Sequence, residues 1–299
     1  MNSDQGGISR RNAIKFAGAT AAAAAALGAS GQVAMAQDMD NPKLFFTDAG
    51  TGKNLMLLHG WTGDSHDWSW QIPALLEKYR VVAVDLRGHG ASEVPKSGRY
   101  QPADYVSDLE HLISNEFGGE EFTIIGHSMG AQVAARLASK RPDLVEAIIS
   151  VDGSLGFAAE LAGLFGSVTS DLADKDLGDV IPPLFDAFYD PATPVPFKVW
   201  HARRPLGMAE APVRESFGPL FLGDDQIGVG VGSEQFCRGL TLPVYHLCRI
   251  ADQAEAMSAW FSNPKSKVEY WSGAGHWIQQ DRPDDVNKAI LAWLETLQA

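Results

Sequence analysis

The sequence predicts an α/β fold with a doubly wound, mostly parallel sheet of eight strands. Short apolar runs of strand length alternate with segments of helical periodicity, a pattern typical of right-handed βαβ units. The chain has 299 residues, of which 45% are hydrophobic and 20% are charged, enough to bury one large core. The formal net charge is −13, and no Lys/Arg cluster follows the first residues. We therefore expect neither nucleic acid nor an anionic membrane surface as a partner.

The first half of the chain contains most of the expected sheet. Its apolar runs are bounded by glycine, proline and polar residues, which mark turns. We expect strands at residues 45–47, 55–58, 81–84, 122–125 and 147–151, and helices at 64–79, 102–117 and 131–140.

The pattern changes after Ser154. Residues 155–238 contain helix-like pieces, many prolines and ten of the aromatic residues, without a clear strand. The strand pattern resumes at 242–247 and 268–271, and a final amphipathic helix covers 283–297. We interpret 37–154 and 239–299 as the core, and 155–238 as a helical cap inserted after the sixth strand. Such an insertion lies over the carboxyl ends of the strands, and we expect most of its aromatics to form its own small core.

The N-terminal segment has the features of an export signal. Arg10-Arg11 precedes an Ala-rich stretch, which ends in the A-x-A site Ala34-Met35-Ala36. This is typical of a twin-arginine signal that is cleaved after Ala36. We expect residues 1–36 to be removed, the protein to be periplasmic or secreted, and no membrane association afterwards. An uncleaved anchor and a disordered tail are the alternatives.

Two cysteines and scattered histidines give no zinc-type spacing, so we expect no metal. In an exported protein a disulfide between Cys237 and Cys248 is worth considering. Cys248 lies inside a strand-like run, however, where a small buried thiol is the commoner explanation.

The pentapeptide Gly126-His127-Ser128-Met129-Gly130 lies between an apolar strand and a helix. A G-x-S-x-G turn in this position exposes the serine hydroxyl beside a base and beside backbone N–H groups. We therefore predict Ser128 as a nucleophile. His59, His127 and His276 all follow expected strands beside glycines, and position alone does not identify the base.

Four motifs, in this order along the chain, resemble those of the α/β-hydrolase superfamily, and in particular its serine esterases and lactonases with a helical lid. They are His59-Gly60-Trp61, residues 85–92, residues 126–130 and Gly275-His276. In that superfamily the order along the chain is serine, acid, histidine, which implies His276 as the base. The resemblance also implies an oxyanion hole formed by the backbone N–H groups of Trp61 and Met129. Residues 85–92 are then a structural loop that braces the rim of the site.

Two aspartates are candidates for the acid of the triad. Asp252 follows the first strand after the cap, where the superfamily usually places this residue, and it is preferred. Asp152 ends the strand before the cap, which is the alternative place. Because neighbouring strands could each reach His276, both stay open.

A serine in this position implies attack on a carbonyl, in contrast to related epoxide hydrolases and dehalogenases, which carry aspartate there. We expect hydrolysis of a small apolar ester or lactone through an acyl-serine intermediate, without a cofactor. A lactone is the preferred subclass. Trp61, Met129 and Trp277 are expected to line the pocket, whereas Trp68 and Trp70 either line it or pack structurally. The alternatives are a cofactor-free perhydrolase of the haloperoxidase type, a C–C bond hydrolase on the same triad, or a ligand-binding receptor.

Overall fold

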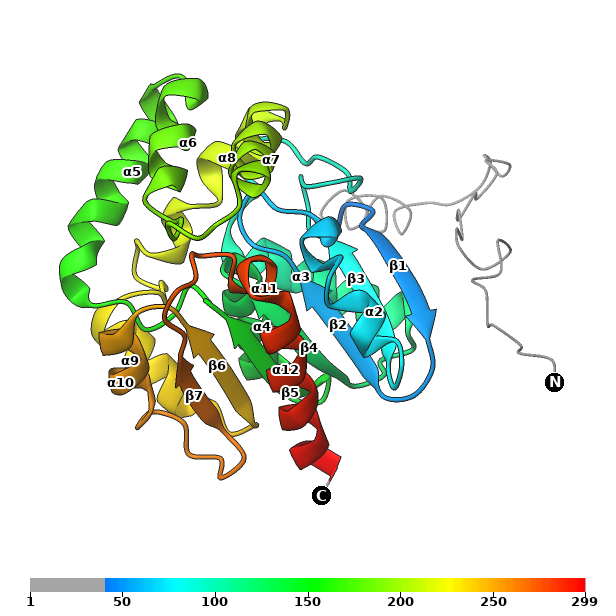
Figure 1. Ribbon diagram of the computed structural model, residues 1–299. Coiled ribbons are helices and arrows are strands. Elements are labelled where there is room, and N and C mark those ends of the chain that lie inside the picture. Colours follow the sequence, from blue (N-terminus) through cyan, green and yellow to red (C-terminus); the bar gives the residue numbers. More distant parts are fainter. Residues whose placement is uncertain (1–40, 299) are drawn as a thin grey trace, which may run out of the picture.

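The computed structural model describes residues 41–298, and its strands form one seven-stranded sheet (Figure 1). The strand order is β1-β3-β2-β4-β5-β6-β7, in which β1 is antiparallel to β3 and all other neighbours are parallel. The strands are β1 (Phe45–Gly50), β2 (Asn54–Leu58), β3 (Arg80–Asp85), β4 (Phe122–His127), β5 (Val145–Val151), β6 (Val244–Cys248) and β7 (Lys267–Tyr270).

The doubly wound α/β class is confirmed, but the count of strands differs from the prediction of eight. Seven are present in the described part of the chain, so the helical insertion follows the fifth of them and not the sixth. The predicted export signal, residues 1–36, lies outside the described residues. Cleavage after Ala36 and export therefore stay predictions.

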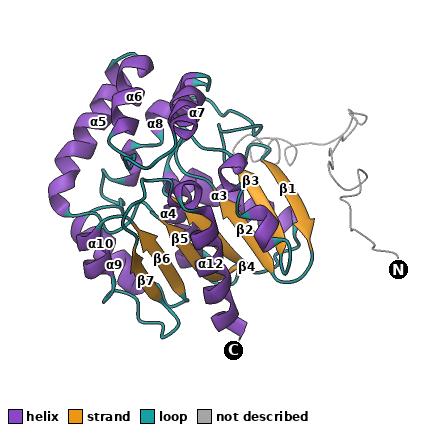
Figure 2. Ribbon diagram, in the orientation of Figure 1, coloured by secondary structure: helices purple, strands orange, loops and turns teal. Residues whose placement is uncertain are grey.

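Helices cover both faces of the sheet (Figure 2). On one face α3 (Pro102–Glu116) and α4 (Met129–Lys140) pack against strand side chains in the larger core. On the other face α2 (Ile72–Leu75) and α12 (Pro283–Gln298) contribute to a second cluster. All six residues of the central strand β4 are buried, because this strand is covered on both sides and flanked by β2 and β5.

The helix expected over residues 64–79 is in fact two short pieces. A 3₁₀ turn, η1, covers Ser65–Trp68, and α2 begins only at Ile72. Pro73 has no N–H, so a continuous helix would lack a backbone hydrogen bond there. The side chain of Gln71 is fully buried and donates to the backbone of Gln279, which fixes the break.

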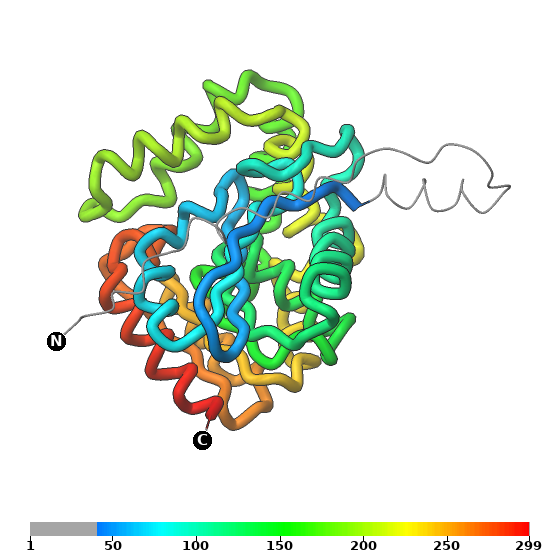
Figure 3. The backbone as a smooth tube through the Cα atoms, turned by 90° about the vertical axis from the view of Figure 1, so that its right-hand side faces the viewer, coloured from blue at the N-terminus to red at the C-terminus, as the bar shows by residue number. Residues whose placement is uncertain are grey.

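The insertion between β5 and β6 is helical, and its first helices gather at one end of the molecule, above the sheet (Figure 3). α9, the last helix of the insertion, lies instead beside α10 (Ala251–Met257) near β6 (Figure 1). We call α5–α8 the cap. The elements of the insertion are η2 (Ala159–Leu161), α5 (Ala162–Asp174), α6 (Leu177–Asp186), α7 (Val195–Leu206), α8 (Glu210–Glu215), η3 (Gly218–Leu220) and α9 (Gly230–Gly239).

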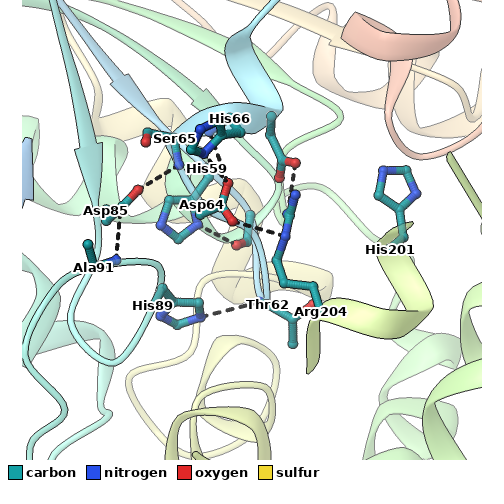
Figure 4. A network of polar contacts seen from close by, with 12 residues as sticks. His59, Thr62, Asp64, Ser65, His66, Asp85, His89, Ala91, His201 and Arg204 are labelled. Atoms are coloured by element: carbon teal, nitrogen blue, oxygen red, sulfur yellow. Dashed lines mark hydrogen bonds and ion pairs between the residues drawn. The ribbon is translucent and has the colours of Figure 1, made fainter. Parts of the chain in front are cut away.

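A polar network, which we call the clasp, joins cap helix α7 to the core (Figure 4). Arg204 forms ion pairs with Asp64 at 3.1 Å and with the buried Asp67 at 2.8 Å. His201 bonds to Gln280 at 2.9 Å, and Gln280 in turn donates to Asp67 at 3.1 Å. These contacts hold α7 against η1 and against α11 (Ile278–Asp281), the short helix that follows His276.

Residues 85–92 are structural, as predicted. The Asp85 carboxylate accepts hydrogen bonds from the backbone N–H groups of Ser65 and Ala91, at 2.7 and 2.8 Å. His59 accepts from Leu86 N–H, and His89 from Thr62 N–H. Figure 4 shows this loop beside the clasp, and together they fix the segment that carries Trp61. Among the helices of residues 41–298, none is both long and apolar enough to span a membrane.

Candidate active site

Ser128 lies at a strained turn between β4 and α4. Its backbone has φ 51° and ψ −117°, which is costly for a residue with a side chain and is expected where the surrounding structure enforces it. Nearby backbone segments leave no space for side chains at Gly126 and Gly130. A Cβ atom on Gly126 would lie 2.4 Å from the backbone N of Ala131, and one on Gly130 would lie 2.5 Å from the carbonyl of Leu58. The turn therefore has the geometry of a nucleophile elbow.

His276 is paired with Asp152, the alternative acid, and the preferred Asp252 is not the carboxylate beside it. The Nδ1 of His276 lies 2.5 Å from Oδ2 of Asp152. Asp152 directly follows β5, and its backbone N–H donates to Leu247 on β6. Asp252 lies within the first turn of α10 and is exposed. This helix begins three residues after the end of β6, and Asp252 is exposed on its surface.

The backbone around His276 is held by the cap. Its N–H donates to the carbonyl of Phe188 at 2.7 Å, and the N–H of Gly275 donates to Asp281. A Cβ on Gly275 would lie 2.7 Å from the Phe188 carbonyl oxygen. The glycine is therefore required by the close approach of the cap backbone.

The Ser128 hydroxyl lies 3.4 Å from the hydroxyl of Ser154, a buried residue. Over the described residues, no hydrogen bond joins Ser128 directly to His276. Both side chains nevertheless line one cavity. Catalytic hydrogen bonds are often formed only with substrate in place.

The two expected oxyanion donors are both available. Met129 is the first residue of α4, so its N–H has no acceptor within the helix. Neither this N–H nor that of Trp61 is engaged in a turn or loop hydrogen bond within residues 41–298. The Met129 side chain, however, is fully buried in the core and does not line the cavity, which corrects its expected role in the pocket.

The cavity has a volume of about 230 Å³ and lies between the strand ends and the cap. Trp61 and Trp277 line it, as predicted, whereas Trp68 belongs to the second core cluster and Trp70 packs on Phe197 of α7. Most aromatics of the insertion border the cavity, contrary to the expectation that most of them form the small core of the insertion. These are Phe157, Phe165, Phe185, Phe188, Phe217 and Phe221.

The electrostatics of the site favour an ionised acid and a neutral His127. Burial raises the pKa of Asp152, but the hydrogen bond from His276 and the charges of His276 and Arg249 outweigh it, so that the pKa falls to about 2. Burial lowers the pKa of His127 to about 3, and the charge of His276 acts in the same direction. His127 is therefore a neutral donor from Nε2 to the carbonyl of His276, at 2.9 Å.

Sequence reasoning missed Ser154 and Arg249. Both line the cavity, and Arg249 donates through its backbone N and through Nε to Asp152, each at 3.1 Å. Their only sequence signal is that each lies just after an expected strand. Cys237 and Cys248 are both buried and free, so they form no disulfide. In the described part of the chain, no group of His, Cys, Asp and Glu could hold a metal ion.

Comparison with known proteins identifies the fold. Residues 53–190 match the family described as the alpha/beta hydrolase fold. Among solved structures, an esterase from Thermogutta terrifontis superposes with a TM-score of 0.74 at 24% identity, covering 86% of this chain and 95% of the esterase. The enol-lactonase from Burkholderia xenovorans LB400 gives 0.72 at 15% identity, covering 85% and 97%. The described residues therefore have the α/β-hydrolase fold.

Two curated relatives match little more than a third of the chain. A soluble epoxide hydrolase from Corynebacterium sp. (strain C12) is 38% identical over 110 residues, which cover 37% of this chain and 38% of the relative. The 2-(acetamidomethylene)succinate hydrolase from Mesorhizobium japonicum is 33% identical over 115 residues, which cover 38% and 41%. The chain therefore spans about two fifths of the length of either relative.

Proposed function

We propose that the protein hydrolyses a carboxylic ester or lactone through an acyl-serine intermediate, with Ser128, His276 and Asp152 as the triad. The observation that carries this proposal is the 2.5 Å contact between His276 Nδ1 and Asp152 Oδ2, in a cavity that also contains Ser128 at a strained turn. This contact keeps Nδ1 protonated, which leaves Nε2 as the basic nitrogen.

In the first half-reaction, Ser128 Oγ forms a bond to the carbonyl carbon while its proton passes to Nε2 of His276. The carbonyl oxygen becomes an oxyanion, which accepts hydrogen bonds from the N–H groups of Trp61 and Met129. Each such donor is typically worth about 3 kcal/mol of transition-state stabilisation. The carbon–oxygen bond to the alcohol then breaks, and His276 returns the proton to the leaving oxygen.

In the second half-reaction, water replaces the alcohol. His276 accepts a proton from the water as the water oxygen bonds to the acyl carbon, and it returns that proton to Ser128 Oγ as the acyl-serine bond breaks. The ionised Asp152 supports the imidazolium in both steps. Its low pKa keeps this support available at neutral pH.

The test compares the mature protein with Ser128→Ala on p-nitrophenyl acetate and butyrate. We expect kcat to fall by about 10⁴-fold or more. Ser170→Ala, at an exposed position of α5, is the matched control and should retain activity. A fluorophosphonate should also add its mass to the wild-type protein at Ser128 only. Equal turnover by wild type and Ser128→Ala would refute the proposal.

Within this proposal we favour a lactone. The cavity is small and lined mostly by aromatic and aliphatic side chains, which suits a folded ring better than a long extended chain. Comparing kcat/KM for a five- or six-membered lactone with that for the ethyl ester of the same carbon number tests the choice. A higher value for the linear ester would assign the protein to the esterases.

A further inference from the structure

An arginine, and not the predicted acid Asp252, reaches the active site from the end of β6. Arg249 directly follows β6, the strand after which Asp252 was expected to reach His276. Its side chain lines the cavity, together with aromatic and aliphatic groups, and is 25% exposed. Apart from the histidines, it is the one ionisable side chain among the described residues that line this cavity.

The contacts of Arg249 use only part of its guanidinium group. Nε donates to Asp152 Oδ2 at 3.1 Å, and the guanidinium carbon lies 6.0 Å from the ring centroid of Phe188 in the cap. An arginine has five N–H donors. Across the described residues, no hydrogen bond acceptor is paired with the Nη1 and Nη2 groups, which leaves four donors for a ligand or solvent.

The ion pair with Asp152 does not account for an arginine in this position. Asp152 is 5% exposed, accepts from His276 and also accepts the backbone N–H of Arg249. A guanidinium in an apolar cavity loses much of its hydration, and this loss is offset when a further anion binds it. The two Nη groups form a planar fork that matches a carboxylate.

We propose that Arg249 selects substrates that carry a free carboxylate in addition to the ester or lactone bond. The substrate class is then the monoesters of dicarboxylic acids, or lactones with a carboxylate substituent. The carboxylate binds Nη1 and Nη2, and the aromatic side chains contact the carbon chain. This inference rests on the proposed function and specifies its substrate.

The first experiment measures a preference. Ethanol release is followed for monoethyl succinate, glutarate and adipate, and for neutral ethyl esters of the same chain length. We expect wild-type kcat/KM to favour one monoester over its neutral counterpart by tenfold or more. Arg249→Gln should lower this ratio at least tenfold, and Arg249→Lys should restore part of it. Arg238→Gln, at a half-exposed position of α9, is the control and should leave the ratio unchanged.

The second experiment does not depend on turnover. Binding of adipate, glutarate and succinate to Ser128→Ala is measured by calorimetry, with the corresponding monocarboxylates for comparison. We expect one dicarboxylate to bind at least tenfold more tightly than its monocarboxylate, and the difference to disappear in Ser128→Ala/Arg249→Gln. Circular dichroism of each variant establishes that it is folded.

The outcomes separate this inference from the proposed function. Ser128-dependent hydrolysis of neutral esters without any carboxylate preference would overturn the role of Arg249 and retain the hydrolase. An equal loss on both substrates in Arg249→Gln, with the ratio unchanged, would reduce Arg249 to a positioning residue for Asp152. Carboxylate binding through Arg249 without Ser128-dependent turnover would retain the binding site and refute the hydrolase.

Discussion

The two sides of the cavity differ in what holds them in place. We call the loops after β4, β5 and β7 the floor, and the cap the roof. In the floor, backbone packs on backbone, so that a Cβ on Gly130 would lie 2.5 Å from a carbonyl oxygen. In the roof, Gly163 and Gly166 of α5 have open space around them, and Leu164 and Trp200 are about half exposed. The floor therefore fixes the reacting groups, whereas the roof can vary in sequence and determine which substrate fits.

The largest expected effect is in the floor. Asp152→Asn should lower kcat by about 10³- to 10⁴-fold, because an amide cannot support the imidazolium or fix its tautomer. Asp252→Asn, on the exposed side of α10, should change kcat by less than twofold. Steady-state kinetics on p-nitrophenyl butyrate checks both. A lower kcat for Asp252→Asn, with kcat unchanged for Asp152→Asn, would mean that His276 uses a different acid from the one that it contacts.

The next effect concerns the clasp that holds the roof. Arg204→Met should lower the free energy of unfolding by about 3 kcal/mol, because it leaves the buried Asp67 without its cation. Arg203→Met, at the exposed neighbouring position, should change it by less than about 0.5 kcal/mol. Urea denaturation gives both values. Similar stabilities would mean that the roof does not depend on the clasp.

Low pH should destabilise both the floor and the roof through their buried histidines. Burial lowers the pKa of His89 and His127 to about 3 and that of His201 and His246 to about 4, all from an ordinary value of 6.5. The unfolded chain then binds more protons, so stability is lost as the pH falls below about 6.5. Burial raises the pKa of Asp108 to about 6, so this carboxyl group acts in the opposite direction.

We therefore expect the free energy of unfolding to be at least about 2 kcal/mol lower at pH 5 than at pH 7, the amount that one such imidazole contributes. Denaturation curves at the two pH values measure it. His111→Gln, at an exposed position of α3, should leave the difference unchanged. Equal stability at both pH values would mean that these imidazoles are protonated in the folded protein.

The smallest effect is a gain of stability in the roof. Gly166→Ala should raise the free energy of unfolding by about 0.5 to 1 kcal/mol, because alanine favours the helix and its Cβ meets no neighbour. Gly130→Ala in the floor should destabilise, because a backbone carbonyl occupies the space. Thermal denaturation of the two variants compares the regions directly. A loss in Gly166→Ala would mean that the roof is packed as closely as the floor.

The choice of the triad acid shows how far the sequence could predict the site. Ser128 and His276 follow from local patterns, a glycine-framed turn and a glycine-rich loop after a strand. Asp152 and Asp252 have equally suitable local patterns, and they differ only in the direction that the chain takes after each strand end. Likewise, the sequence does not distinguish a phenylalanine that lines the cavity from one that packs on another ring. Phe165 and Phe221 line the cavity and also stack on each other.

The sequence by itself determined the alternation of strands and helices, the position of the insertion between two strands, and the serine turn. These features depend on backbone conformation and on the period of apolar residues, which neighbours in the chain specify. The tertiary structure alone decided that Asp152 pairs with His276, that Arg249 enters the cavity and that the residues 64–79 form two pieces. Such contacts join residues far apart in the chain, and their geometry depends on how loops leave the sheet and on how the cap packs over it.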